Sequence, residues 1–441
     1  MTKSMNDIPL VTSEYVPVYG IPALATQAEW ARDYGPIYRR RSDDGNECFI
    51  FMVGPEANRF VFHTGRQHFS HDQGWTPIIG ETLGHGLLNM DDPEHAVHRR
   101  MWNPAFTAAA MEAYVPIIQR VIAQRTQHWP AQESVDVYHE AREITFDAAA
   151  AALAGFEPGP DVDRMRQLFY TLIGYNPDGL TFEEYQHRAR QTRLELGAMM
   201  IGLIQARRAV PESEQTHDVL GTIVHARNDQ GQLLSDDQIM AHLNILLVAG
   251  HETTTTLSAW VLAKLASEPA HRKRILAELT AAIGDEASEP TVEELRNLPA
   301  LDAFIKETGR LHGPVFNVPR GVVSDFEFAG YHVPAGQSVR LALAAGHRLP
   351  NVFADPETFD PDRFASPREE DKKQPYSLVT FGGGARICIG INFANIETKA
   401  LAVHVLRHFD LELLDHDITF AGYWTAFLPN GVHMRFKRKS A

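Results

Sequence analysis

The chain has 441 residues, of which 44% are hydrophobic, so it can bury a large core. Its formal net charge of -15 argues against nucleic acid as a partner, because binding to phosphate backbones needs clustered Lys and Arg. No apolar run is long enough to span a bilayer, and the opening MTKSMNDIPLVTSEY lacks the charged and then apolar plan of a signal peptide. We therefore expect a cytoplasmic protein with no membrane anchor, in which Cys48 and Cys388 stay unpaired.

The N-terminal part, roughly residues 8–70, is expected to contain a small β-sheet. Several prolines separate short apolar stretches as far as YGPIYRRR, where strand-like sequence begins. The segments ECFIFMVG (47–54) and NRFVFHT (58–64) are rich in Phe, Val and Ile. Each of them predicts a strand.

The middle of the chain, roughly residues 94–312, has apolar residues at spacings of three and four, which predicts a helical body. The clearest helix begins at Ser235, which could form a capping box with Gln238, and it stops before Pro269. At 1.5 Å per residue it should extend about 50 Å. Because it is apolar on most faces, we expect it to cross the middle of the protein.

The last part, roughly residues 314–441, combines short strands with one more helix. The stretch DFEFAGYHVPAGQSVRLAL (325–343) predicts strands around Gly and Pro turns, and a helix should begin just after Cys388. No linker or repeat divides the chain. We therefore predict a single domain over 1–441, mainly α with small β-sheets.

The segment FGGGARICIG (381–390) places Cys388 in a glycine-rich loop directly before a helix. The free N–H groups at the start of a helix stabilise a thiolate, and Arg386 adds positive charge nearby. Three other interpretations are a phosphate-binding loop, a buried structural cysteine and a papain-type nucleophile. The first lacks the Gly-Lys-Ser/Thr ending of such loops, whereas the other two stay open on these residues alone.

The same segment resembles the signature of the cytochrome P-450 family, which is Phe, two residues, Gly, any residue, Arg, any residue, Cys, any residue, Gly. Every fixed position is matched, by Phe381, Gly384, Arg386, Cys388 and Gly390. The resemblance implies the cytochrome P-450 fold, with haem b lying between the long central helix and the Cys loop. Cys388 would be the axial ligand of the haem iron, and Phe381 and Arg386 would also contact the cofactor.

Two further groups of charged residues match the family. Glu307 and Arg310 lie three apart on a predicted helix and could form a surface ion pair, but the resemblance implies a buried network with Arg363 of PDRF. In the same region Gly309 and Gly313 replace residues that are common in the family, and we expect local looseness there. The resemblance also assigns the haem propionates to three basic residues, His95, Arg99 and Arg320.

Within the long helix, AGHETT places Gly250 in a helix interior, where glycine costs about 1 kcal/mol relative to Ala. A zinc motif His-Glu-x-x-His is incomplete, because its second ligand position is Thr255. The family has its oxygen-activation motif here, matched by Ala249, Gly250, Glu252 and Thr253. The resemblance implies a groove for dioxygen, with Thr253 holding a water by hydrogen bonding and Glu252 relaying protons from solvent.

The residues expected to surround the substrate are apolar. Ile245, Val248, Ala249 and Thr253 share one helical face, and no charged side chain stands out among the expected lining. An apolar small-molecule substrate follows as a hypothesis. The other expected lining residues lie outside this helix and are Trp75 in the loop 72–88, Phe316 and Phe427.

A thiolate ligand favours cleavage of the O–O bond, so the resemblance implies a monooxygenase that uses O2 for hydroxylation or epoxidation. No flavin or ferredoxin segment is visible, and we expect electrons from a separate donor, a ferredoxin or flavodoxin with its reductase. A peroxide-driven peroxygenase and a haem-thiolate sensor are alternatives. The first would not need Glu252 and Thr253, and the second would be expected to carry an output domain.

Overall fold

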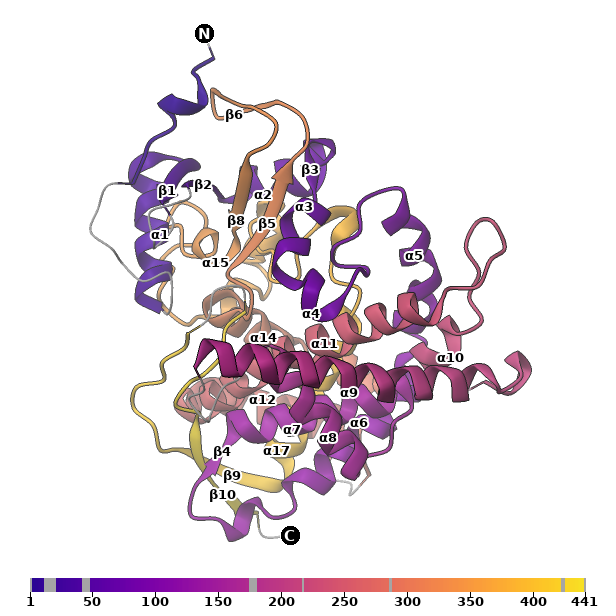
Figure 1. The fold of residues 1–441 in the computed structure, drawn as a ribbon. Coiled ribbons are helices and arrows are strands. Elements are labelled where there is room, and N and C mark those ends of the chain that lie inside the picture. The colour runs from indigo at the N-terminus through magenta and orange to yellow at the C-terminus, as the bar shows by residue number, and fades with distance from the viewer. Residues whose placement is uncertain are drawn as a thin grey trace.

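The computed structural model describes residues 2–11, 21–41, 48–173, 181–215, 218–284, 288–421 and 425–439. A helical body separates a five-stranded sheet, at the top of Figure 1, from a three-stranded sheet at the bottom. Most of the buried apolar side chains form one cluster among the helices, and a second cluster packs on the five-stranded sheet. The architecture is mainly helical with small sheets, as predicted.

The five-stranded sheet has the order β1-β2-β8-β5-β3. Its strands β2 and β8 are parallel and its other neighbours are antiparallel. The strands of this sheet are β1 (Ile37–Arg41), β2 (Cys48–Val53), β3 (Phe69–Ser70), β5 (Asn317–Val322) and β8 (Ser338–Ala342). Segments before and after the helical body therefore lie together in one sheet.

Two smaller antiparallel sheets complete the β-structure. One has the order β4-β10-β9, and the other is the hairpin β6-β7 predicted around Gly330. Their strands are β4 (Val135–Asp136), β6 (Phe326–Phe328), β7 (Tyr331–Val333), β9 (Phe409–Leu413) and β10 (His433–Arg438).

The helical body begins at Glu94 and ends at His312. Its helices are α5 (Glu94–Trp102), α6 (Met111–Thr126), α7 (Val137–Ala154), α8 (Pro160–Leu172), α9 (Phe182–Arg208), α10 (Val219–Ile223), α11 (Asp236–Ser267), α12 (Pro269–Ala282), α13 (Val292–Arg296) and α14 (Pro299–His312). The remaining helices are α1 (Ile21–Tyr34), α2 (Pro55–Arg59), α3 (Asp72–Trp75), α4 (Glu81–Leu83), α15 (Leu343–Gly346), α16 (Glu370–Lys373) and α17 (Ile391–His408).

Helix α11 is the central element of the fold, as its composition predicted. The Ser235 hydroxyl accepts from the Gln238 N–H, and the Gln238 side chain accepts from the Ser235 N–H at 3.0 Å, so the capping box is confirmed. The helix ends at Ser267, before Pro269. Its 32 residues span about 48 Å, and most of its side chains are buried against α7, α9, α14 and α17.

The prediction of a strand over residues 58–64 is wrong. Helix α2 continues into a π-helical turn, η2 (Phe60–Thr64). Gly54, at φ 95°, ends β2, and Pro55 then occupies the first helical turn, where its missing N–H costs nothing. A short apolar run suits a buried helix as well as a strand, so this segment was ambiguous. The expected loop 72–88 likewise contains short helical turns, α3, η4 (Thr76–Gly80) and α4.

None of the described helices combines the length and the apolar character needed to cross a membrane.

Candidate active site

The segment with Cys388 forms a tight turn before α17. The Cys388 N–H donates to the Phe381 carbonyl at 2.9 Å, and α17 begins three residues after the cysteine. Gly384 has φ 63°, and a Cβ on it would lie 2.1 Å from the carbonyl oxygen of Phe62. Glycine is therefore required there both by the left-handed backbone and by the close approach of η2.

The thiol of Cys388 is accessible although it lies deep in the protein. The side chain has exposed surface, yet the surrounding protein excludes enough water to raise its pKa. The Gly390 N–H and the positive charge of Arg99 act in the opposite direction and lower the pKa. The expected neighbour Arg386 instead donates to the carbonyl of Met90 at 2.7 Å, so Arg99 is the cation that favours the thiolate.

Four of the predicted cofactor-binding residues form a basic cluster beside the Cys loop. Arg99 donates to the carbonyl of Ile387 at 2.9 Å, which ties α5 to the residue before Cys388. Burial and the nearby Arg386 and Arg99 lower the pKa of His95 to about 4. Burial, and then Arg386, lower the pKa of Arg320 on β5 to about 9. The three arginines of the cluster repel one another and would be stabilised by an anionic ligand.

His71 also belongs to this cluster and was missed by the sequence analysis. Burial and the charges of Arg320, Arg386 and His95 all lower its pKa well below the usual value. Its backbone N–H donates to Asp91 at 2.6 Å, which fixes the start of α3. His71 follows a two-residue strand without any motif, so no local pattern marked it.

The middle of α11 has an accessible face within an otherwise buried helix. Ala249 is exposed, Gly250 and Thr253 are partly exposed, and a Cβ on Gly250 would meet no atom within 4 Å. The Thr253 hydroxyl donates to the Ala249 carbonyl at 2.7 Å, and that of Thr254 donates to the Gly250 carbonyl at 2.9 Å. This face therefore has room beside the backbone and a hydroxyl oxygen that can accept a hydrogen bond.

Glu252 is held in a buried ion pair with a residue that the sequence did not indicate. Its Oε1 lies 2.6 Å from Nη2 of Arg142 on α7 and 2.8 Å from Nε2 of His251. Burial opposes ionisation, but the attraction of His251 and Arg142 outweighs it and lowers the pKa of Glu252 to about 2. At neutral pH the Glu252 carboxylate is therefore ionised and holds no proton of its own.

Glu307, Arg310 and Arg363 lie together and are fully buried. Both carboxylate oxygens of Glu307 accept from Arg310, at 2.7 and 2.8 Å, and Oε1 also accepts from Nε of Arg363 at 3.2 Å. The arginines further donate to the carbonyls of His347 and Asp355, each at 2.9 Å. This network fastens α14 to the segments on either side of residue 360.

The expectation of looseness around Gly309 and Gly313 is wrong, because both glycines lie in close contacts. A Cβ on Gly309 would lie 3.1 Å from Cγ2 of Thr380, in the segment before the Cys loop, and 3.9 Å from Cδ1 of Leu257 on α11. A Cβ on Gly313 would lie 2.6 Å from the Gly309 carbonyl. Because Gly309 has no side chain, Leu257 of α11 and Thr380, just before the Cys loop, can both pack closely against α14.

The predicted substrate-lining residues are only partly brought together. Ile245 is buried and Val248 partly buried on α11, and a Cβ on Gly86 would lie 2.8 Å from Cδ1 of Ile245, so the segment after α4 packs there. Phe316 is buried, with its ring centroid 5.2 Å from that of Phe420. Of the other two predicted residues, Trp75 is buried on α3 and Phe427 is 45% exposed.

A cleft of about 410 Å³ opens next to this region of α11. Its lining comes mainly from α4, α8, α9 and α11, and it combines apolar with charged side chains. The apolar ones include Leu83, Leu172, Leu196 and Met240, and the polar and charged ones include Asn244, Glu81, Glu94, Arg193 and Asp237. Its volume is within the range of pockets for small organic molecules.

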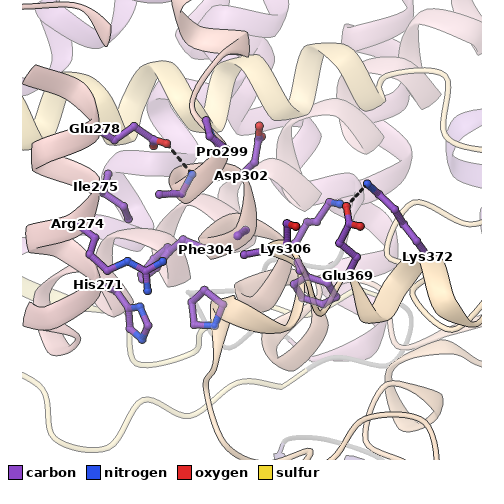
Figure 2. Close-up of a pocket in the computed structure, with 16 residues that line it drawn as sticks. His271, Arg274, Ile275, Glu278, Pro299, Asp302, Phe304, Lys306, Glu369 and Lys372 are labelled. Atoms are coloured by element: carbon purple, nitrogen blue, oxygen red, sulfur yellow. Dashed lines mark hydrogen bonds and ion pairs between the residues drawn. The ribbon is translucent and has the colours of Figure 1, made fainter. Parts of the chain in front are cut away.

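A second groove, of about 530 Å³, lies between α12, α14 and residues 361–372 (Figure 2). It contains none of the predicted site residues. The cations that Figure 2 labels in it have carboxylate partners, Lys306 with Asp371, Arg274 with Asp362, and Lys372 with Glu369. This groove is therefore not part of the candidate active site.

The residues present fit a haem group. Cys388 offers an accessible sulfur, the usual soft ligand of a haem-thiolate iron. The basic cluster suits the two propionates, because Arg320 and Arg99 form no ion pair with a carboxylate in the described part of the chain.

Comparison with known proteins agrees with this site. The cytochrome P450 family profile matches residues 24–420. The chain is 30% identical over 368 residues to putative cytochrome P450 136 of Mycobacterium tuberculosis, covering 82% of this chain and 74% of the relative. It is 28% identical over 375 residues to the sterol 14alpha-demethylase of Mycolicibacterium vanbaalenii, covering 82% of each.

Solved structures show the same fold. Retinoic acid bound cyanobacterial CYP120A1 superposes with a TM-score of 0.83 and 27% identity, over 93% of both chains. The cytochrome P450DA heme domain superposes with a TM-score of 0.86 over 98% of both chains, and at 22% identity it supports the fold alone. The chain belongs to the cytochrome P450 family of haem-thiolate monooxygenases.

Proposed function

We propose that this protein inserts one oxygen atom of O2 into an apolar organic substrate, by hydroxylation or epoxidation, with electrons from a separate donor, a ferredoxin or flavodoxin with its reductase. The observation that carries the proposal is the accessible face of α11 at Ala249, Gly250 and Thr253, which has apolar Ile245 and Val248 one turn away. Haem bound through a cysteine thiolate activates dioxygen for this reaction. The protein has to bind and orient the substrate and to control water and protons.

On the haem side we assign the sulfur of Cys388 as the iron ligand. Arg99 has two roles in this assignment, since its charge favours the thiolate and its guanidinium also belongs to the basic cluster. We assign the propionates to His95, Arg99, Arg320 and Arg386, and we add His71, which lies among their charges.

On the oxygen side we assign Thr253 as the group that holds a water. Its hydroxyl proton is used in the bond to the Ala249 carbonyl, so the Thr253 oxygen is left to accept a hydrogen bond from a water. Glu252 next to it is ionised, and we propose that it passes protons from outside towards the water on Thr253 while Arg142 and His251 hold its carboxylate in place. A proton relay of this kind is needed when O2 is the oxidant and is not needed when peroxide is used.

We propose that the substrate enters by the cleft of about 410 Å³ beside α4, α8 and α9. Leu83, Leu172 and Leu196 supply apolar surface, and Asn244 can orient one polar group. The names of two similar proteins, a sterol 14alpha-demethylase and a retinoic acid-bound P450, refer to large molecules that are mostly hydrocarbon. Both similarities support a substrate of this chemical class.

Two experiments test the enzyme assignment. The reduced protein with carbon monoxide should show the strongly red-shifted Soret band of a thiolate-ligated haem, and a histidine-type spectrum would contradict Cys388 as the ligand. A screen of sterols, retinoids and small organic acids for ligand-induced spin shifts should select the apolar compounds. Selection of small charged compounds would refute the proposed substrate class.

The role of Thr253 has a matched control in the next residue. Thr253→Ala should consume electrons without forming product and should release peroxide, because the water that it holds is lost. Thr254→Ala removes the same kind of hydroxyl-to-carbonyl bond but from a buried position, and it should stay coupled. Equal coupling in the two variants would remove Thr253 from the relay. Turnover with NADPH alone would contradict a separate electron donor.

A further inference from the structure

Three metal-ligating side chains meet at the end of α17 that lies farthest from Cys388. The ligand atoms of Glu289, His404 and His408 all lie within 4.8 Å of one another. His404 and His408 are four residues apart on α17, so their rings share one helix face, with centroids 4.6 Å apart. Arg407 donates to the Ser288 carbonyl at 2.9 Å, which fixes the segment that carries Glu289 against the helix.

The hydrogen bonds of Thr126 determine which nitrogen of His404 carries a proton. The Thr126 hydroxyl donates to the carbonyl of Ile122 at 2.9 Å, and it has only one proton to give. Its contact with Nε2 of His404, also 2.9 Å, must therefore be donated by the histidine. In the neutral ring, Nδ1 then has a free lone pair.

Nδ1 of His404 is buried and faces the carboxylate of Glu289, which can also only accept a hydrogen bond. The His404 side chain is only 10% exposed, and its Nδ1 has no hydrogen-bond partner among the described residues. The nearest carboxylate oxygen, Oε1 of Glu289, lies 3.9 Å away, which is too long for a hydrogen bond. A lone pair facing a carboxylate is unfavourable unless a proton or a cation lies between them.

The arrangement around His404 is that of a metal-binding histidine. Such a histidine donates its other ring N–H to an oxygen, which here is the hydroxyl of Thr126. Two imidazoles and one carboxylate suit Zn²⁺ and similar divalent ions, whereas Mg²⁺ and Ca²⁺ prefer oxygen ligands alone. With bonds of about 2.1 Å, tetrahedral ligand atoms lie about 3.4 Å apart. A small rotation of Glu289, whose side chain is 42% exposed, would close the gap.

Charges around the cluster act in both directions. The Glu289 carboxylate adds negative charge next to His408, whereas Arg407 and Arg438 add positive charge near the same ring. The two arginines also repel a cation, which should moderate its affinity. We infer that Glu289, His404 and His408 bind one divalent transition-metal ion of the Zn²⁺ class, with water in the fourth position.

The metal would join the end of α17 to the segment before α13. His404 lies 13 residues after Ile391, the first residue of α17, which is about 20 Å along the helix axis, so the ion would have no part in oxygen chemistry. Its consequence would be structural, because an ion that binds only the folded protein raises its stability.

The test uses the haem-containing protein with any affinity tag removed and chelator washed out. Isothermal titration with ZnCl2 at pH 7.5 should show one equivalent bound, and thermal unfolding should shift upward with zinc. Glu289→Gln and His408→Ala should each weaken binding at least tenfold. His416→Ala, which changes an exposed histidine outside the cluster, should bind zinc as the wild type does.

The spectrum of the reduced protein with carbon monoxide should be the same in all of these proteins, so a failure of the haem assignment is distinguishable from a failure of this one. Zinc binding that is absent, or unchanged when Glu289→Gln and His408→Ala are combined, would overturn the inference. Nitrogen-15 spectra that show His404 protonated at both ring nitrogens in the presence of zinc would also overturn it, because a plain ion pair with Glu289 would then explain the contact.

Discussion

The buried charge network of Glu307, Arg310 and Arg363 can be tested by neutralising its one anion. Glu307→Gln keeps the size of the side chain but leaves Arg310, which is fully buried, without a counter-charge, and it leaves Arg363 only its longer ion pair with Glu370 at 3.5 Å. Two unit charges about 4 Å apart attract by about 4 kcal/mol at an effective dielectric constant of about 20. Removing one partner of a buried pair costs about 3–5 kcal/mol in practice. We expect a loss of that size in the free energy of unfolding.

An exposed pair of the same geometry serves as the control. Arg164 and Glu195 are joined by two bonds of 2.6 Å, but their side chains are 55% and 43% exposed, so solvent screens the pair. Glu195→Gln should therefore leave the stability nearly unchanged. The assay is urea unfolding of the haem-containing protein, followed by circular dichroism and by the Soret band. Equal shifts of the urea midpoint in the two variants would refute the argument that burial makes the network important.

Three further predictions concern pH and backbone conformation. The low pKa of Glu252 contributes about 3 kcal/mol of stability at pH 7, and Glu252→Gln should remove it. The difference in unfolding free energy between the two proteins should shrink as the pH falls from 4.5 towards 2. A difference that stays constant with pH would be contrary evidence. Glu397 is buried and its pKa is raised well above 4.5, so the native protein keeps this proton while the unfolded chain loses it. The free energy of unfolding of Glu397→Gln should therefore rise relative to that of the wild type by up to about 1.4 kcal/mol per pH unit above 4.5. Parallel curves of unfolding free energy against pH for the two proteins would argue against this. Gly384→Ala should lower the haem content, measured as the ratio of Soret to protein absorbance. Gly330 also has a positive φ but has open space around it, so Gly330→Ala should keep the haem content. Equal haem content in the two variants would show that the contact with Phe62 is unimportant.

Features that depend on nearby residues were predictable from the sequence. The capping box at Ser235 and the stop before Pro269 gave the bounds of α11, and the turn residues around Gly330 gave the β6-β7 hairpin. The prediction for residues 58–64 failed because a short apolar run such as residues 60–62 fits a strand and a buried helical turn equally.

Features that depend on distant residues could be predicted only by resemblance to a family. Arg142 pairs with Glu252 from another helix, and His71 joins the basic cluster from the position between β3 and α3. Neither residue has a local pattern that marks it. The resemblance identified Arg363 as a partner of Glu307, but it did not show that Arg99, and not Arg386, is the cation that favours the thiolate.

The contact between Gly384 and Phe62 also constrains the order in which the protein can assemble. The backbone of η2, near the beginning of the chain, lies against the loop before Cys388, near its end. This loop cannot reach its final shape by local folding, because part of its support is η2. The ribosome makes η2 long before it makes the loop, so their contact has to wait for the C-terminal segment. Capture of the cofactor is therefore expected to be a late event in biogenesis, after both ends of the chain have met.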